Sequence, residues 1–162
     1  MREVRSARQD DLSAIVRIYN HAVAHGVATF DLEPWQVEER REWLASFDET
    51  HPMLVCEDDG VVVGYAYYVP YRARPAYGAT KEATVYVDPA HHRQGIGAAL
   101  YEQLLAHATR SGVHVMIAVL GGHNEGSEAL HRRLGFEYAG SLPEVGRKFD
   151  QWVDTTLMVR RL

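Results

Sequence analysis

Two glycines, Gly95 and Gly97, stand between a stretch that favours a β-strand and one that favours a helix, and this junction constrains the fold more than any other feature. The run Val85-Tyr86-Val87 is β-branched or aromatic, as a buried strand prefers, and Asp88-Pro89 ends it. After the glycines, one face of a helix is indicated by the spacing of Ile96, Ala99, Leu100, Gln103, Leu104 and Ala108. Gly112 is expected to end this helix. The sequence therefore predicts a strand, a tight loop and a helix.

The two glycines predict an anion site at the start of that helix. Because glycine has no Cβ, consecutive backbone N–H groups can face a ligand where the helix dipole is positive. A dinucleotide fingerprint needs a third Gly or Ala where Leu100 stands, and a P-loop needs Gly-Lys-Ser/Thr, which is absent. The remaining interpretation is a cradle for another pyrophosphate.

Composition narrows the class of protein. A chain of 162 residues predicts one domain over residues 1–162, and 46% apolar with 24% charged residues is typical of a soluble globular protein. The net charge of −5 argues against nucleic-acid or anionic-membrane partners. We expect neither a membrane span nor a signal peptide. A single cysteine cannot form an internal disulfide, so we expect a cytoplasmic protein in which Cys56 packs in the core.

The order of expected elements is β-α-α-β-β-β-α-β-α-β-β, which is neither doubly wound nor barrel-like. Strands are predicted at residues 4–7, 53–57, 61–69, 82–87, 113–120, 137–141 and 152–161, and helices from Asp10 or Asp11, Pro34, Gln94 and Glu125. His21 and His25 lie one helical turn apart, but without a third ligand we expect no metal site.

The pattern of a basic residue or Gln followed by x-x-Gly-x-Gly/Ala resembles the Gcn5-related N-acetyltransferase (GNAT) superfamily, in which this turn grips the pyrophosphate of acetyl-CoA. One departure is His92, where Arg or Gln is usual. The resemblance implies the α/β (α+β) GNAT fold, with a mixed, mostly antiparallel twisted sheet of about seven strands and about four flanking helices.

Nearly the whole chain resembles the phosphinothricin N-acetyltransferase family. The resemblance rests on segments 18–21, 29–34, 71–77, 82–87, 124–131, 134–136, 146–149 and 152–154. It implies Glu82 and His131 as the acid/base pair. It implies cofactor contacts from Val85, Tyr86, Val87, Arg93, Gln94, Gly95, Ile96, Gly97, Ala98 and Asn124, and substrate contacts from Arg72, Arg74, Tyr77 and Phe30.

The same residues suit acetyl transfer chemically. The amine must lose a proton, the thioester oxygen needs hydrogen-bond donors, and the thiolate must leave. Glu82 opens the strand that runs into the cradle, so its carboxylate is expected near the thioester. His131 suits either an acid or a base because the unperturbed histidine pKa is about 6.5. Two arginines, Arg72 and Arg74, favour an anionic substrate such as an amino acid.

The leading hypothesis is an N-acetyltransferase that acts on the α-amine of phosphinothricin, methionine sulfoximine or methionine sulfone by direct attack in a ternary complex. The resemblance also implies a role in herbicide or antibiotic resistance, and a homodimer. Two alternatives stay open: another acceptor (a peptide N-terminus, a polyamine or an aminoglycoside), or a non-catalytic acetyl-CoA sensor. Departures from the family at Ala79, Lys81 and Asp150 put the preferred substrate in doubt more than the reaction.

Overall fold

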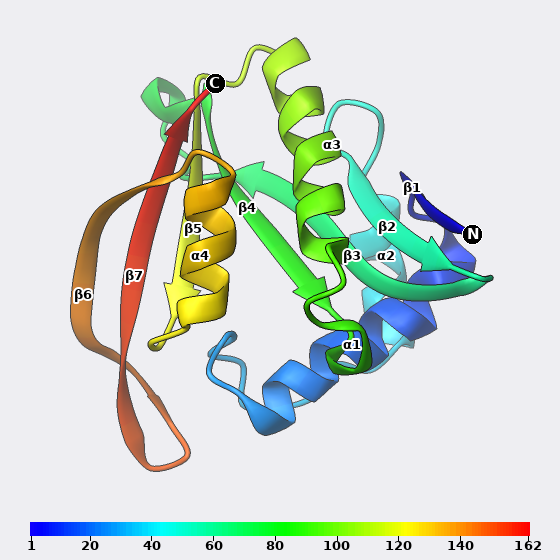
Figure 1. The fold of residues 1–162 in the computed structure, drawn as a ribbon, viewed down its shortest axis with the longest axis horizontal. Helices are drawn as coiled ribbons and strands as arrows, with labels where there is room; N and C mark the ends of the chain where they lie inside the picture. Colours follow the sequence, from blue (N-terminus) through cyan, green and yellow to red (C-terminus); the bar gives the residue numbers. More distant parts are fainter.

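Seven strands form one sheet in the order β1-β2-β3-β4-β5-β7-β6, and every neighbouring pair is antiparallel except β4 and β5 (Figure 1). The computed structural model describes residues 1–162. The strands are β1 (Arg2–Ser6), β2 (Met53–Asp58), β3 (Val61–Pro70), β4 (Thr80–Val87), β5 (Val115–Gly121), β6 (Glu137–Lys148) and β7 (Gln151–Arg161). The expected mixed, mostly antiparallel sheet is confirmed.

Helices cover both faces of the sheet. They are α1 (Leu12–His25), α2 (Arg41–Ala45), α3 (Ile96–Arg110) and α4 (Glu125–Arg133). Figure 1 shows α3 and α4 in front of the sheet, with α1 and α2 behind it. None of the four is long and apolar enough to cross a membrane.

Strand alternation builds a separate core on each face. On β2, Leu54 and Cys56 join the apolar cluster under α3, whereas Met53 and Val55 join the cluster under α1. Successive side chains of a strand point to opposite faces, so a continuous apolar run serves both cores. Cys56 is fully buried, as expected for a core residue.

The helix expected from Pro34 is the main error in the predicted elements. A 3-10 turn at Glu38–Arg40 and the five-residue α2 replace it. The side chain of Asn20 donates to the carbonyl of Trp35 at 2.9 Å and accepts from its N–H at 2.8 Å. These two hydrogen bonds hold the backbone of Trp35 against α1, and residues 34–36 are not helical.

Two smaller differences concern a helix face and a strand length. On α3 the buried face includes Tyr101 and Leu105, while Gln103 is exposed. Strand β6 runs past Ser141 to Lys148, since register shifts on either side of Leu142 let it follow β7 for its full length.

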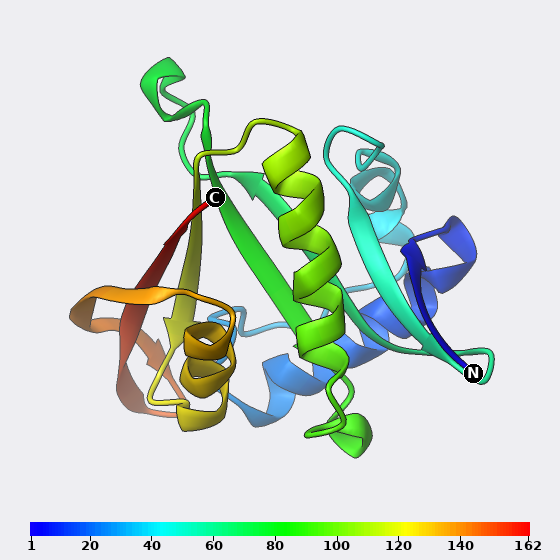
Figure 2. The same ribbon diagram turned by 45° about the horizontal axis from the view of Figure 1, so that its top comes forward.

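The parallel pair is short, and this positions the site. Pairing of β4 with β5 begins at Thr80 and Val115 and ends at Ala83 and Ala118. Both strands continue beyond that point without pairing with each other, and Figure 2 shows them diverging toward α4 and the start of α3. The sheet therefore opens in its middle.

Candidate active site

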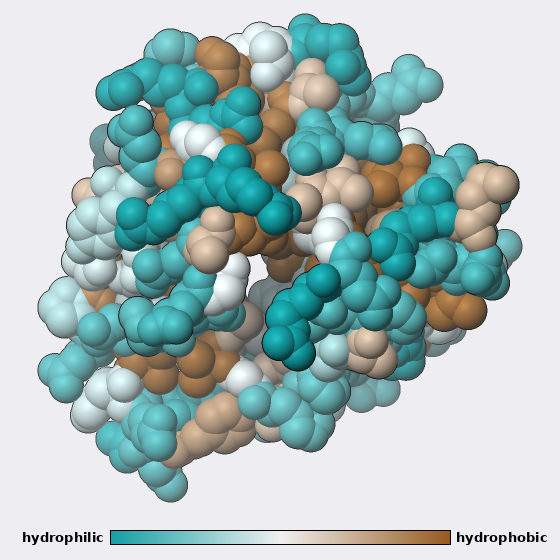
Figure 3. All heavy atoms as spheres, viewed as in Figure 1, coloured by the Kyte–Doolittle hydropathy of each residue, from teal (hydrophilic) through white to brown (hydrophobic).

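A cavity of about 290 Å³ fills the opening between β4 and β5. Figure 3 shows the surface hollowed at this place, between α4 and the first turn of α3. The lining residues come from both strands, the two helices and the loop after α1: Ala28, Thr29, Phe30, Glu82, Ala83, Thr84, Val85, Tyr86, Tyr101, Ala118, Val119, Leu120, Gly121, Asn124, Ser127, His131 and Thr155. On its β5 side, the β4 segment Thr84–Val87 leaves backbone groups without a strand partner.

Glu82 lies in the wall of this cavity, in the last paired part of β4. Its side chain is half-buried, and burial raises the pKa of the carboxyl above the ordinary 4.5, while the positive charge of Arg72 acts in the opposite direction. A carboxyl with a raised pKa is a stronger base once ionised, which suits proton abstraction.

His131, on α4, is almost fully buried and also lines the cavity. Its Nδ1 lies 2.6 Å from the carbonyl oxygen of Ser127, which can only accept, so Nδ1 carries the proton. Its Nε2 then accepts from the hydroxyl of Tyr101 at 2.8 Å. Burial lowers the pKa of His131 below 6.5, so the ring is neutral near pH 7.

Tyr101 is the site residue that sequence reasoning missed. It is buried, lines the cavity and packs edge-on against both His131 and Phe136. Burial raises the pKa of its hydroxyl, so the group stays protonated. A tyrosine on the buried face of a predicted helix needs a hydrogen-bond partner, and that signal was available in the sequence.

The twin-glycine junction has the backbone geometry of an anion cradle. Gly95 is left-handed, with φ of +80°, and a Cβ there would meet nothing within 4 Å. Arg93 is also left-handed, and Ile96 and Gly97 open α3. Backbone of alternating handedness directs successive N–H groups into one concavity. The departure His92 has a structural partner, because its Nε2 lies 3.0 Å from the carbonyl oxygen of Val87.

Asn124 and Phe30 form two further parts of the wall. The Asn124 side chain caps α4 by accepting from the N–H of Ser127 at 2.9 Å. Phe30 lies on the loop after α1, and its ring fills the space above Gly146. Tyr86 packs edge-on against Tyr19, which bonds to Thr29 beside Phe30.

The three remaining substrate candidates lie outside the cavity. Arg72, Arg74 and Tyr77 are exposed on the segment between β3 and β4, and none of them lines the opening. Tyr77 packs edge-on against Tyr71, and the Arg72 guanidinium lies 5.0 Å from the Tyr71 ring centre. Arg72 is still near enough to Glu82 to affect its pKa.

Metal ligands do not gather anywhere in the chain. No group of three or more His, Cys, Asp or Glu side chains could hold an ion, and the rings of His21 and His25 stack on each other at 4.4 Å.

The model of the acetyltransferase (GNAT) family matches residues 15–136, which include β4, the cradle and α4. The chain belongs to this family, so its class is that of enzymes that transfer an acetyl group.

Individual relatives extend the likeness to the whole chain. The L-methionine sulfoximine/L-methionine sulfone acetyltransferase of Salmonella typhimurium is 39% identical over 98% of this chain and 94% of that protein. The phosphinothricin N-acetyltransferase of Streptomyces coelicolor is 40% identical over 99% and 96%. The crystal structure of a GNAT superfamily phosphinothricin acetyltransferase from Sinorhizobium meliloti in complex with AcCoA has a TM-score of 0.95 at 38% identity, and the likeness covers 99% of this chain and 88% of that one.

Proposed function

We propose that this protein transfers the acetyl group of acetyl-CoA to the α-amine of a small amino acid or analogue of the phosphinothricin or methionine sulfoximine type. The observation that carries the proposal is the cavity between β4 and β5, which has Glu82 in its wall and the twin-glycine cradle beyond the end of β4. Relatives with nearly full-length similarity carry the names of both substrates.

Bound acetyl-CoA supplies the thioester that the amine attacks. We assign its diphosphate to Arg93–Ala98 and its pantetheine arm to the open edge of β4 at Val85–Val87, with Asn124 beside it. The unpaired N–H groups of that edge can donate to the arm and to the thioester oxygen. This arrangement directs the acetyl group toward Glu82.

In this proposal Glu82 is the general base. Glu82 takes the extra proton of the ammonium group, the neutral amine forms the new bond to the acetyl carbon, the carbon–sulfur bond breaks, and the proton that the nitrogen then loses ends on the departing thiolate. Cys56 is buried in the core, away from the cavity, which fits direct attack in a ternary complex without an acyl-enzyme.

The hydrogen bonds of His131 favour an accepting role over a donating one. Because Nδ1 donates to the carbonyl of Ser127 and the ring is neutral, Nε2 can only accept, and it accepts the hydrogen bond of the Tyr101 hydroxyl. The Tyr101 oxygen then has lone pairs left for an N–H in the cavity it lines. We therefore infer that Tyr101 and His131 orient the amine for attack.

The acceptor carboxylate or phosphinate is assigned to the exposed Arg72 and Arg74, with Tyr77 beside them and Phe30 on the cavity wall. A guanidinium offers two parallel donors to such an anion. The electrostatic effect of Arg72 on Glu82 supports this placement, because it puts the cation and the base within range of one ligand.

Free-thiol release on mixing protein, acetyl-CoA and acceptor tests the function. We expect turnover with phosphinothricin, methionine sulfoximine and methionine sulfone. Turnover confined to spermidine, an aminoglycoside or a peptide N-terminus would instead identify a different acceptor class, and methionine sulfone would then fail to compete. Coenzyme binding without thiol release from any of these amines would identify a sensor module.

We further propose a homodimer working in the cytoplasm, without membrane or nucleic-acid partners. Five large apolar side chains are exposed on the β6–β7 hairpin: Tyr138, Leu142, Val145, Phe149 and Trp152. Such a patch favours self-association. Light scattering after size exclusion is expected to give twice the 18.3 kDa chain mass, and a single-chain mass would contradict the dimer.

A further inference from the structure

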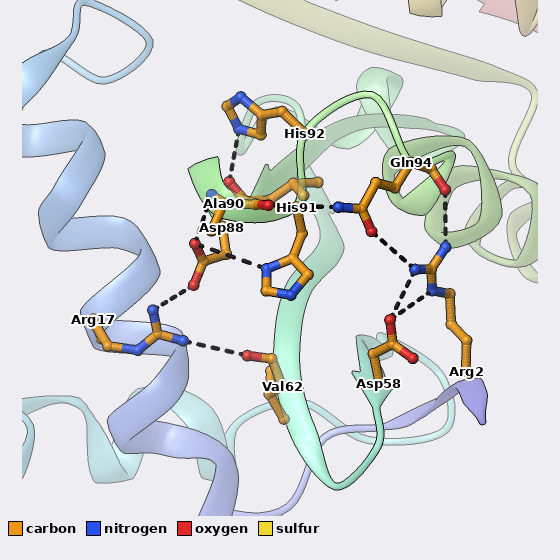
Figure 4. Close-up of polar contacts among 10 residues, drawn as sticks. Arg2, Arg17, Asp58, Val62, Asp88, Ala90, His91, His92 and Gln94 are labelled. Atoms are coloured by element: carbon orange, nitrogen blue, oxygen red, sulfur yellow. Dashed lines mark hydrogen bonds and ion pairs between the residues drawn. The ribbon is translucent and has the colours of Figure 1, made fainter.

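The loop that leads into α3 is held by arginines from elements distant in sequence. We call residues Asp88–Gly95 the cradle loop. Figure 4 shows Arg2 of β1 reaching it from one side and Arg17 of α1 from the other. Neither arginine belongs to the motif of glycines, and neither lines the cavity between the strands.

Arg2 binds the end of the cradle loop through its whole fork. Its Nη1 donates to the carbonyl oxygen of Gln94 at 2.8 Å, and its Nη2 donates to Oε1 of the same residue at 3.1 Å. Asp58, the last residue of β2, orients the guanidinium by accepting from Nη2 at 2.8 Å and from Nε at 3.3 Å. The geometry is that of a bidentate arginine, which is specific in direction.

Arg17 fixes the other end of the loop. It forms an ion pair with Asp88 and reaches the carbonyl oxygen of Val62 at 3.4 Å. Asp88 also accepts from the N–H of Ala90 at 3.0 Å, which shapes the turn after β4. The loop between the two arginines contains left-handed Arg93, a conformation that a non-glycine residue keeps only when its surroundings impose it.

The contact of Arg2 with a carbonyl has a consequence for the adjoining N–H. In a trans peptide the C=O and N–H groups point in opposite directions, and this chain has no cis peptide. The carbonyl of Gln94 and the N–H of Gly95 belong to one peptide plane. By holding the carbonyl toward β1, Arg2 turns the Gly95 N–H the opposite way, away from β1.

We propose that Arg2 is a positioning residue for the diphosphate of the acyl donor, acting through the Gln94–Gly95 peptide, with Asp58 orienting Arg2 and Arg17 fixing the loop's far end. The inference rests on the proposed function in taking acetyl-CoA as the donor. An N–H that is already oriented costs no ordering on binding, so losing Arg2 weakens the complex without touching the reacting atoms.

A simpler role would be that Arg2 attracts the anionic coenzyme by its charge alone. Asp58 separates the two roles, because an Asp58→Asn change removes a negative charge near the cradle while loosening the fork on Arg2. Charge attraction predicts tighter coenzyme binding by this variant, whereas positioning predicts weaker binding.

The test measures calorimetric CoA binding together with steady-state kinetics for two donors, acetyl-CoA and S-acetylpantetheine, which has no diphosphate. For Arg2→Gln we expect the Kd for CoA and the KM for acetyl-CoA to rise about 5- to 30-fold, a loss of about 1–2 kcal/mol. We expect kcat at saturating acetyl-CoA, and kcat/KM for S-acetylpantetheine, to stay within about twofold. Asp58→Asn should shift the same constants in the same direction. The control is Arg41→Gln, which breaks a more exposed bidentate pair with Glu38 (2.6 and 2.7 Å) away from the loop.

Unchanged CoA affinity in Arg2→Gln, or tighter binding in Asp58→Asn, would overturn the inference. An equal loss with both donors would also overturn it, since a general structural defect does not distinguish them. If the proposed function were wrong, the wild-type protein would bind CoA without acetylating any amine. The calorimetric Kd for CoA would still show whether Arg2 contributes to binding.

Discussion

At the scale of single residues, burial decides how the ionisable groups of the cavity behave. It raises the pKa of Glu82, which makes the carboxylate a stronger base, and it lowers the pKa of His131, which keeps the imidazole neutral near pH 7. Both groups line one cavity, where the ring of His131 is hydrogen-bonded to Tyr101 and the carboxyl of Glu82 is affected by the more distant charge of Arg72.

Replacing Glu82 by Gln is expected to lower kcat by about 10²- to 10⁴-fold while leaving acetyl-CoA affinity nearly intact. In the wild type, kcat/KM should fall on acidification as the carboxylate is protonated, with a midpoint above 4.5 because the folded pKa is raised. A raised folded pKa also means that ionised Glu82 costs stability above that pH, so the variant should be no less stable at pH 7. Unchanged turnover would remove Glu82 from the mechanism.

Tyr101 and Tyr65, two of the three fully buried tyrosines, offer a matched pair. Tyr101→Phe leaves the Nε2 of His131 without its donor and should lower the free energy of unfolding by about 1–3 kcal/mol. The Tyr65 hydroxyl is buried with no partner, so Tyr65→Phe should be neutral or stabilising. Denaturant titration of both variants measures the difference, and equal losses would contradict the hydrogen-bond assignment.

The sequence predicts site residues whose spacing belongs to a motif, but not those whose neighbours are brought together only by the fold. The strand-to-helix motif led to the glycines, which lie at the start of α3, and the family resemblance led to Glu82 and His131, which both line the cavity. Tyr101 was missed because its partner lies 30 residues away on another helix. Arg72 and Arg74 are exposed outside the cavity, so their assignment to the substrate stays a prediction.

At the scale of elements, the loop between α1 and α2 closes one side of the cavity. It packs closely against two glycines, Gly121 and Gly146, which leave room for it because they have no side chain. A Cβ on Gly146 would collide with the ring of Phe30, and one on Gly121 would collide with the backbone carbonyl of Val27. The loop is also held by Lys148, which donates to the carbonyl of Thr29 at 3.0 Å. The Phe30 side chain can rotate away from an added Cβ more readily than the Val27 backbone can shift.

We expect Gly146→Ala to displace the Phe30 ring and raise the acceptor KM several-fold with little change in melting temperature. Gly121→Ala must move backbone and should destabilise the fold by about 1–3 kcal/mol. Gly126→Ala is the control, since its nearest neighbour would be the Asn124 Oδ1 at 3.7 Å. Equal melting temperatures for the Gly121 and Gly126 variants would contradict the close approach of the loop.

The β6–β7 turn shows why glycine is usual in the family at the position of Asp150, and it leads to a stability prediction. Phe149 and Asp150 are both left-handed, with φ of +52° and +58°, as a two-residue hairpin turn requires. Glycine adopts this conformation without strain, so Asp150→Gly should stabilise by up to about 1 kcal/mol, a rise of about 2–4 °C in Tm. Asp10→Gly, at an exposed position with negative φ, should not stabilise, and a parallel rise there would contradict the argument.

At the scale of the whole molecule, the cavity lies where β4 and β5 stop pairing with each other. Strand periodicity and turn residues predicted the strand order along the chain, because those signals are local. The end of pairing at Ala83 and Ala118 depends on register between strands 35 residues apart, which no local pattern encodes. The helix from Pro34 failed for a related reason, since Asn20 of α1 holds the backbone of Trp35. That residues 1–162 form one domain stays a prediction.

The central claim is that the cradle holds the diphosphate of acetyl-CoA and directs its acetyl group along β4 to Glu82. A crystal structure of the complex tests it directly. We expect diphosphate oxygens within hydrogen-bonding distance of the N–H groups of Gly95–Gly97, and the thioester between β4 and β5 beside Glu82. A coenzyme bound elsewhere, or one whose acetyl group points away from Glu82, would contradict the account.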